Sequence, residues 1–384
     1  MYLIQHGELF APVSMGKQDI LVEGTQISWI GSGIRPEAWP GLKVIDAREL
    51  MVFPGIVDAH AHIAGAGGEG GPATRTPEMQ LSGLLRAGIT TVIGCLGTDG
   101  MTRNLEGVLM KVKSLRMQGI SSWMYTGAYQ VPPPTLTGDV GRDIALIEEV
   151  IGAGEIALSD HRSSVPTTHE LIRIAEHARV GGMLGGKAGI VNIHMGDARD
   201  PFKPIHEAIR QSELSYKQFY PTHCNRNAYI FNDARTYGKK GWIDLTTSSY
   251  PYFPEDEVKP SEALKILLDA GVPAAHITMS SDAHGSLPKF DEEGTLVRLE
   301  MGDPGSMLRE LRDAVQSGVA IPESISTITA NPARILGLHG KGQVAPGRDA
   351  DLLITDREFN VVHLLAMGRL LVENGDLRVK GNYE

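Results

Sequence analysis

Eight short apolar runs alternate with helix-like segments between residue 55 and about residue 320, and this alternation constrains the fold more than any other feature. Several of the intervening segments end in glycine, as helices do where the chain turns towards a following strand. The runs are apolar on both faces, which is typical of buried parallel strands. The pattern predicts an α/β fold, a (β/α)8 TIM barrel. The runs are GIVDAHAH, TTVIGCLG, SSWMYTGAY, EIALSD, GIVNIHMG, QFYPTHC, WIDLTTS and HITMSSDAHG.

An open, doubly wound sheet is the alternative arrangement of such runs. It would gather its functional residues at one switch point in the strand order. In this chain, reactive side chains follow many of the runs, at the position where barrel active sites lie. The distribution therefore favours the barrel.

The two ends of the chain have a different pattern. Near the start, DILVEGTQISWIG holds two β-rich runs separated by Glu-Gly-Thr, which indicates a hairpin. Near the end, GQVAPGRDADLLITD and FNVVHLLAMGRLLVENGDLRVKG read in the same way. We expect short strands at both ends, outside the barrel.

The composition excludes several classes of partner. A formal net charge of −10 disfavours binding to nucleic acid or to a membrane surface. The sequence contains no run of about 18 consecutive apolar residues, which a membrane-spanning helix would need. The two cysteines, Cys95 and Cys224, form no CxxC pair, and the opening MYLIQHGELFAP lacks the features of a signal peptide. We expect a cytoplasmic protein in a reducing compartment.

Five potential metal ligands follow the apolar runs at matching depth. His60 and His62 are two residues apart and so point the same way from one strand. The fifth, sixth and eighth runs supply His194, His223 and Asp282. These ligand types suit zinc, with manganese, iron, cobalt or nickel as alternatives. Five ligands exceed the need of one tetrahedral catalytic zinc, and two metals about 3.5–4 Å apart would use them all.

The run EIALSD begins with Glu155, where an apolar residue is expected. A carboxylate at the mouth of a buried strand is either a solvated edge residue or a ligand. This run lies between the two groups of candidate ligands, and a metal pair needs a bridging anion from the protein. Glu155 is therefore the candidate bridge.

These residues and the motifs around them resemble the amidohydrolase superfamily of metal-dependent hydrolases, through PGIVDAHAH, the single histidines of the fifth and sixth strands, the Asp of the eighth strand and GQVAPGRDADLLITD. Within it, the chain is similar to the isoaspartyl (β-aspartyl) dipeptidase family, through GGEGGPATRTPE, GCLGTDG, TGAYQVP, SDHRS, HMGD, PTHCNRN and SSDAHGS. The resemblance covers essentially the full chain. It implies a small β-sandwich domain from residues 1–52 and 342–384, a barrel over residues 53–341, and a homo-oligomer.

The resemblance also assigns metal ligands. One metal would be held by His60, His62 and Asp282, and the other by His194 and His223. The family bridges the metals with a carboxylated lysine, whereas this chain has Glu155 at that position. The carboxylate of glutamate is closer to its own Cα, so it can bridge only if the strand or the metals shift by a few Å. Lys187 precedes the fifth strand and is expected at the opposite mouth of the barrel.

Further roles follow from the same resemblance. Asp282 would orient a metal-bridged hydroxide, accept its proton and pass it to the leaving amine. Tyr129 would donate to the developing oxyanion. The substrate-binding residues that it implies are Glu69 for the free amino group, Thr98 beside it, and Arg162, Arg226 and Ser286 for the carboxylates.

The resulting expectation is a binuclear metallohydrolase that uses two divalent ions, zinc before others, and cleaves the isopeptide bond of small β-aspartyl dipeptides. A second possibility is another amidohydrolase activity, such as cyclic-amide hydrolysis or aminopurine deamination, which a glutamate on the fourth strand favours. An uncharged purine base as substrate needs no pair of arginines, which weighs against that alternative. A third possibility is a metal-free binding scaffold, but such a protein would be expected to lose its ligands.

Overall fold

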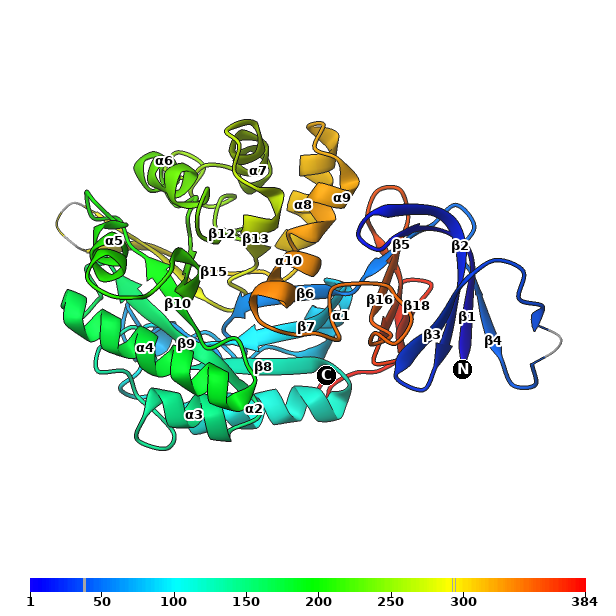
Figure 1. The fold of residues 1–384 in the computed structure, drawn as a ribbon, viewed down its shortest axis with the longest axis horizontal. Helices are drawn as coiled ribbons and strands as arrows, with labels where there is room; N and C mark the ends of the chain where they lie inside the picture. Colours follow the sequence, from blue (N-terminus) through cyan, green and yellow to red (C-terminus); the bar gives the residue numbers. More distant parts are fainter. Residues whose placement is uncertain (37–38, 292, 294) are drawn as a thin grey trace.

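The computed structural model describes residues 1–36, 39–291, 293 and 295–384. It has a mixed α/β fold in which the middle of the chain forms a curled parallel sheet covered by helices (Figure 1). Strands from both ends of the chain, coloured blue and red in Figure 1, form a separate sheet beside it.

Each of the eight apolar runs contains a parallel strand, as the alternation predicted. Strands β6 to β11 pair in chain order in one six-stranded sheet, and β12 and β13 form a parallel pair. Their residues are almost all buried, which explains why the runs lack polar alternation. The strands are β6 (Ile56–Ala61), β7 (Ile89–Gly94), β8 (Ser121–Thr126), β9 (Val150–Leu158), β10 (Ile190–Met195), β11 (Phe219–Thr222), β12 (Ile243–Thr246) and β13 (Ile277–Ser280).

Backbone hydrogen bonds join the end of β13 to β6. The amide of Asp282 donates to the carbonyl of His60 at 3.1 Å, and the amide of His62 donates to the carbonyl of Ala283 at 2.8 Å. The first and last strands of the series are therefore neighbours, and the sheet curls back on itself.

A buried carboxylate connects β11, β12 and β13. The Asp244 side chain accepts hydrogen bonds from Thr222 at 2.7 Å, Thr278 at 2.6 Å and Ser280 at 2.5 Å. The amide of Cys224 also donates to the carbonyl of Asp244 at 3.0 Å. These contacts connect strands that the main sheet does not pair, and they satisfy a carboxylate that would be costly to bury alone.

Helices follow most of the parallel strands, and their boundaries have local causes. Thr167 and Glu170 form a capping box at the start of α4, and Gly119 ends α2 in the left-handed conformation. Within the described ranges, no helix is both long and apolar enough to cross a membrane. The helices are α1 (Leu81–Arg86), α2 (Leu105–Gln118), α3 (Val140–Leu146), α4 (Thr168–Gly185), α5 (Lys203–Arg210), α6 (Ala228–Tyr237), α7 (Pro260–Asp269), α8 (Ser306–Gln316), α9 (Ile321–Ser326) and α10 (Ala330–Ile335), with short 3-10 turns at Pro72–Thr74, Tyr216–Gln218 and Ala274–His276.

The two ends of the chain form one nine-stranded sheet, which confirms that both ends are β-rich. Strand β5 joins them, because it pairs parallel with β1 and antiparallel with β16. The sheet buries its own cluster of apolar side chains, including Ile4, Ile27 and Leu352. The strands are β1 (Tyr2–Phe10), β2 (Ser14–Glu23), β3 (Gln26–Gly31), β4 (Lys43–Asp46), β5 (Met51–Pro54), β16 (Leu352–Thr355), β17 (Val361–Ala366), β18 (Arg369–Glu373) and β19 (Asp376–Leu377).

Two features differ from the sequence prediction. An antiparallel hairpin, β14 (Ser286–Phe290) and β15 (Leu296–Met301), follows β13 and was not predicted. Strand β9 begins at Val150, so Glu155 lies inside the strand and is fully buried rather than placed at its mouth. Gly152 and Gly154, of a residue type common in turns, both lie inside β9.

Candidate active site

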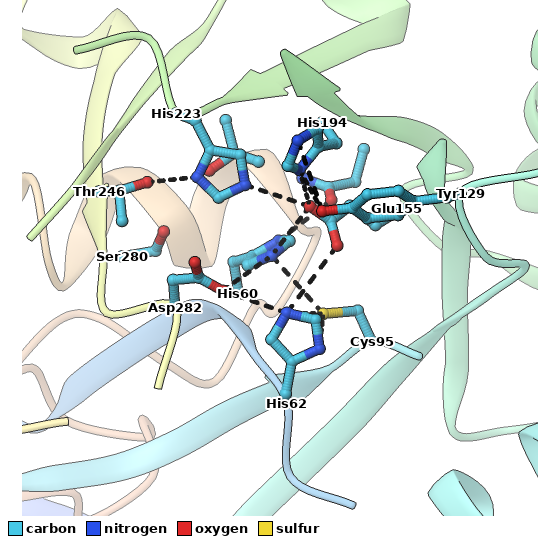
Figure 2. Close-up of polar contacts among 12 residues, drawn as sticks. His60, His62, Cys95, Tyr129, Glu155, His194, His223, Thr246, Ser280 and Asp282 are labelled. Carbon is cyan, nitrogen blue, oxygen red and sulfur yellow. Dashed lines mark hydrogen bonds and ion pairs between the residues drawn. The ribbon is translucent and has the colours of Figure 1, made fainter. Parts of the chain in front are cut away.

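Six polar side chains from five strands converge at the carboxyl ends of the parallel strands. All six are buried, and Figure 2 shows their polar groups facing one another. They come from β6, β9 and β10 and from the residues directly after β6, β11 and β13. The six are His60, His62, Glu155, His194, His223 and Asp282, which are the metal ligands proposed from the sequence.

Glu155 lies at the centre of this cluster. Its Oε1 is 2.7 Å from His194 Nδ1, 3.1 Å from His223 Nε2 and 3.5 Å from His60 Nε2. Its Oε2 is 3.9 Å from His62 Nε2. The glutamate side chain, although shorter than a carboxylated lysine, therefore lies close to both pairs of histidines, His60 with His62 and His194 with His223.

A β-bulge explains this reach. The register of β9 against β10 shifts between Val191 and Ile193, so Gly154 and Glu155 together oppose Asn192. Such a bulge bends its strand and re-aims a side chain. Gly154 has a φ of 145°, and a Cβ there would lie 2.7 Å from the carbonyl oxygen of Asn192. The bulge thus lies directly at the residue whose carboxylate is at the centre of the cluster.

Two of the histidines are oriented by partners on their outer nitrogens. His60 Nδ1 lies 3.1 Å from the Asn192 side-chain oxygen, and His223 Nδ1 lies 2.6 Å from Thr246 Oγ1. In both rings Nε2 is then left facing Glu155, as in metal sites where an outer partner fixes the tautomer. Neither Asn192 nor Thr246 was predicted, because nothing in the sequence distinguishes them from ordinary strand residues.

Asp282 is held at the end of β13 in an uncommon conformation. Its φ is 52°, and His223 likewise has a φ of 61°. Backbone strain of this kind often marks functional positions. The neighbouring Ser281 amide donates to buried Asp58 at 3.1 Å, which anchors this segment against β6. Asp282 Oδ1 consequently lies 3.1 Å from His62 Nε2.

The electrostatics of the cluster favour charged carboxylates. Burial alone would raise the pKa of Glu155, but the charges of His60 and His194 and hydrogen bonds to the imidazoles hold it well below its usual range. Burial likewise opposes ionisation of Asp282, yet contacts with His62 and His223 lower its pKa. Burial and the adjacent His194 lower the pKa of His223 to about 3, so its imidazole is neutral and free to act as a ligand.

The residues fit divalent metal ions. Glu155 Oε2 and Asp282 Oδ1 are buried, accept no hydrogen bond from the described residues and both face His62, so a cation at this place would satisfy their charge. Imidazole nitrogens and carboxylate oxygens are typical zinc ligands. Two groups have ligand atoms that all lie within 4.8 Å of one another: His60, His62, Cys95 and Glu155, and Glu155, His194 and His223. The groups share Glu155.

Glu69, Thr98 and Arg162 lie together beside this cluster. Thr98 Oγ1 donates to Glu69 Oε1 at 3.1 Å, and Arg162 Nη1 is 3.5 Å from the same oxygen. Asp160 fixes Arg162 through two hydrogen bonds of 3.0 and 2.9 Å. Asp160 was not among the predicted site residues, although it stands two residues before Arg162 in the same SDHRS motif.

His194 links the cluster to the remaining predicted residues. Tyr129 Oη is 2.7 Å from its Nδ1, and Arg226 Nη1 is 3.0 Å from its Nε2. Burial raises the pKa of Tyr129 well above its usual value, so the phenol keeps the proton that a donor requires. Arg226 also donates to the carbonyl of Met195 at 3.2 Å, which fixes its guanidinium at the mouth of the cluster.

A cavity of about 670 Å³ is lined by His223, Asp282, Arg162 and Arg226, among other residues. Ser286, at the start of β14, lines it with a buried hydroxyl that has no hydrogen-bond partner among the described residues, and the hairpin supplies part of its wall. Glu257 also lines the cavity and was not predicted; burial raises its pKa to about 7. Lys187, expected away from the site, donates to the carbonyl of Ile144 at 2.7 Å.

Comparison with solved structures finds close similarity over the full chain. A β-aspartyl dipeptidase from the thermophilic, keratin-degrading Fervidobacterium islandicum AW-1, solved in complex with the β-Asp-Leu dipeptide, is 40% identical, with a TM-score of 0.94 over 100% of this chain and 98% of that one. A D-hydantoinase from Thermus sp. shares the fold at 20% identity, with a TM-score of 0.69 over 99% of this chain and 97% of that one.

Similarity to curated proteins is weaker. A dihydroorotase from Lactobacillus gasseri is 22% identical over 93% of this chain and 89% of its own length. An adenine deaminase from Kosmotoga olearia is 25% identical over 97% of this chain but 61% of its own length. The sequence profile of the Amidohydrolase family matches residues 255–371. Because the full-length match at 40% identity agrees with this family match, the chain belongs to the amidohydrolase family and, within it, resembles the β-aspartyl dipeptidases.

Proposed function

We propose that this protein is a binuclear metallopeptidase that hydrolyses the isopeptide bond of β-aspartyl dipeptides. In this proposal residues 53–341 form a (β/α)8 barrel that carries the site, and residues 1–52 and 342–384 form a small β-sandwich domain. His60, His62 and Asp282 would hold one zinc ion, His194 and His223 would hold a second, and Glu155 would be the ligand shared by both.

The observation that carries the proposal is the group of two guanidiniums and two carboxylates at the mouth of the histidine cluster. Asp160 contacts both arginines, and Glu69 lies beside Arg162. A β-aspartyl dipeptide has one free amino group and two free carboxylates. Glu69 matches the amino group, and its Oε2 is buried without a hydrogen-bond partner among the described residues. Arg162 and Arg226 match the carboxylates, since guanidinium binds carboxylate in a bidentate manner. Ser286 offers a further buried hydroxyl that is left for a ligand.

The metals, when bound, would activate water and polarise the scissile carbonyl. Asp282 is adjacent to His62 at 3.1 Å and acts as the base that takes the proton of the attacking water and returns it to the leaving amine. Tyr129 keeps its proton and donates to the oxygen that gains charge. Asp160 acts indirectly, because it holds Arg162 through two hydrogen bonds.

A second candidate is hydrolysis of a cyclic amide. The dihydroorotases among the relatives favour it, as does a plain glutamate at the centre of the site. The two arginines that line the cavity, with Glu69 beside Arg162, favour the zwitterionic dipeptide instead, because a small cyclic amide would leave part of this charge unpaired.

The test is a substrate panel on one preparation whose metal content is measured. We expect about two zinc ions per chain and hydrolysis of β-Asp-Leu, with little hydrolysis of α-Asp-Leu or dihydroorotate. Preference for α-Asp-Leu would contradict the isopeptide assignment, and preference for dihydroorotate would favour the second candidate. A metal-free preparation that remains inactive after zinc addition would contradict both.

A further inference from the structure

Cys95 lies inside the metal cluster, although the assigned ligand set does not include it. It follows β7 directly and is completely buried. Its Sγ is 3.6 Å from His60 Nε2, and 3.7 and 3.8 Å from the two ring nitrogens of His62. Figure 2 shows the sulfur facing these two rings and the carboxylate of Glu155.

These separations are those of ligands on one metal ion. With Zn–N bonds of about 2.0–2.1 Å and Zn–S bonds of about 2.3 Å, tetrahedral geometry places neighbouring ligand atoms about 3.4–3.6 Å apart. The Cys95 Sγ to His60 Nε2 distance of 3.6 Å matches this spacing, and so does the 3.5 Å between His60 Nε2 and Glu155 Oε1.

A second observation points to a cation at the same place. Glu155 Oε2 is buried, has no hydrogen-bond partner among the described residues and faces the His62 side of the cluster, 3.9 Å from His62 Nε2. Its Oε1 already contacts His194 and His223. Oε2 is thus the oxygen of the glutamate without a partner, and it lies on the His62 side of the cluster, where Cys95 offers a further anionic ligand beside Asp282.

The other cysteine offers a contrast. Cys224 is also buried, but its Sγ donates to the carbonyl of Pro221 at 3.4 Å, and it belongs to neither group of potential metal ligands in the described ranges. The Cys95 thiol has a weaker backbone contact, 3.6 Å from the carbonyl of Ala61. Of the two sulfurs, Cys95 is the one placed to bind metal.

We propose that Cys95 binds, as a thiolate, the metal that His60, His62 and Asp282 would hold, so that the thiolate joins two imidazoles and the carboxylates of Asp282 and Glu155 around this ion. The thiol proton leaves to solvent when the metal binds. Such a ligand favours zinc or cobalt over manganese, because thiolate is soft. This inference rests on the metal site of the proposed function, which it extends by one ligand.

X-ray absorption spectroscopy of the zinc-loaded wild-type protein tests the proposal without any substitution. We expect a sulfur scatterer at about 2.3 Å, in addition to nitrogen and oxygen neighbours at about 2.0–2.2 Å. A protein that holds two zinc ions and hydrolyses β-Asp-Leu, yet has only nitrogen and oxygen neighbours, overturns the Cys95 assignment and leaves the proposed function intact. Failure to bind zinc would contradict both.

Cobalt substitution then identifies the sulfur, with the two cysteines as matched positions. The Co(II) protein should show near-ultraviolet absorption from thiolate-to-cobalt charge transfer. Cys224→Ala should retain this absorption, whereas Cys95→Ala should lose it and bind one of its metal ions less tightly. Absorption that survives in Cys95→Ala, or that disappears in Cys224→Ala instead, overturns the assignment.

Discussion

Replacing Gly154 by alanine tests whether the bulge in β9 aims Glu155 into the site. The added Cβ would lie 2.7 Å from the carbonyl oxygen of Asn192 and 2.8 Å from its Cβ, in a fully buried part of the sheet. Alanine also rarely adopts the φ of 145° that Gly154 has. We expect β9 to move away from β10, which would withdraw the Glu155 carboxylate from His194 and His223.

The magnitude follows from two contributions. Backbone strain at such a φ costs about 1–3 kcal/mol, and forcing a methyl group into a filled site costs about 1–3 kcal/mol more. The unfolding free energy should therefore fall by about 2–6 kcal/mol. The entropy of unfolding is about 2.1 cal/mol/K per residue, or roughly 0.8 kcal/mol/K for this chain of 384 residues, so Tm should fall by about 3–7 °C.

Calorimetry and metal analysis on the same samples measure the effect, with Gly138→Ala as the control. Gly138 has a φ of 88°, but a Cβ there would contact nothing within 4 Å. The control should lose only the strain contribution and keep both metals, whereas Gly154→Ala should also lose metal. If Gly154→Ala kept its metals, its activity and a Tm within about 1 °C of wild type, the role given to the bulge would be wrong.

Four further substitutions probe the site. Arg226→Met should lower kcat/KM for β-Asp-Leu at least about tenfold, through loss of a charged hydrogen bond, and an unchanged value would remove Arg226 from substrate binding. Glu155→Ala should remove most of the activity and bound metal; retention of both metals at full rate would make the glutamate a bystander. Tyr129→Phe should lower kcat about 10²–10³-fold with little change in KM, and a change confined to KM would contradict the oxyanion role. Burial raises the pKa of Glu257 to about 7, so the ionisation of this residue should lower the stability of chelator-treated protein as pH rises from about 4.5 to 7. Glu257→Gln should lack this loss of stability, and Tm–pH curves of wild type and variant that run parallel would refute the prediction.

Much of the fold could be predicted because strand burial leaves a simple signal. The eight parallel strands are buried almost throughout, so their sequences read as uninterrupted apolar runs. The hairpin of β14 and β15 was missed for the opposite reason, since its residues are mostly exposed or half-buried and show no apolar periodicity. The start of β9 was missed because Gly152 and Gly154 are turn residues by composition, while their role here is close approach between strands.

The residues of the site also differ in how well the sequence predicts them. Residues predicted to act together, such as His60, Glu155 and Asp282, do converge, because strand ends in a parallel sheet meet at one edge. Asn192 and Thr246 could not be inferred, since their role depends on which nitrogen of a neighbouring ring faces outward, and that is a property of packing across strands.

Three features of the cluster have a common physical basis. A glutamate has a shorter reach than the carboxylated lysine of the family that the sequence resembles, and the bulge in β9 lies directly at Gly154 and Glu155. Glu155 Oε1 contacts His194, His223 and His60, whereas Oε2, on the His62 side, has no hydrogen-bond partner among the described residues. The sulfur of Cys95 lies on that side. In the proposed metal site, the glycine, the glutamate and the cysteine would form one arrangement, in which a bent strand and a thiol together take the place of a longer side chain.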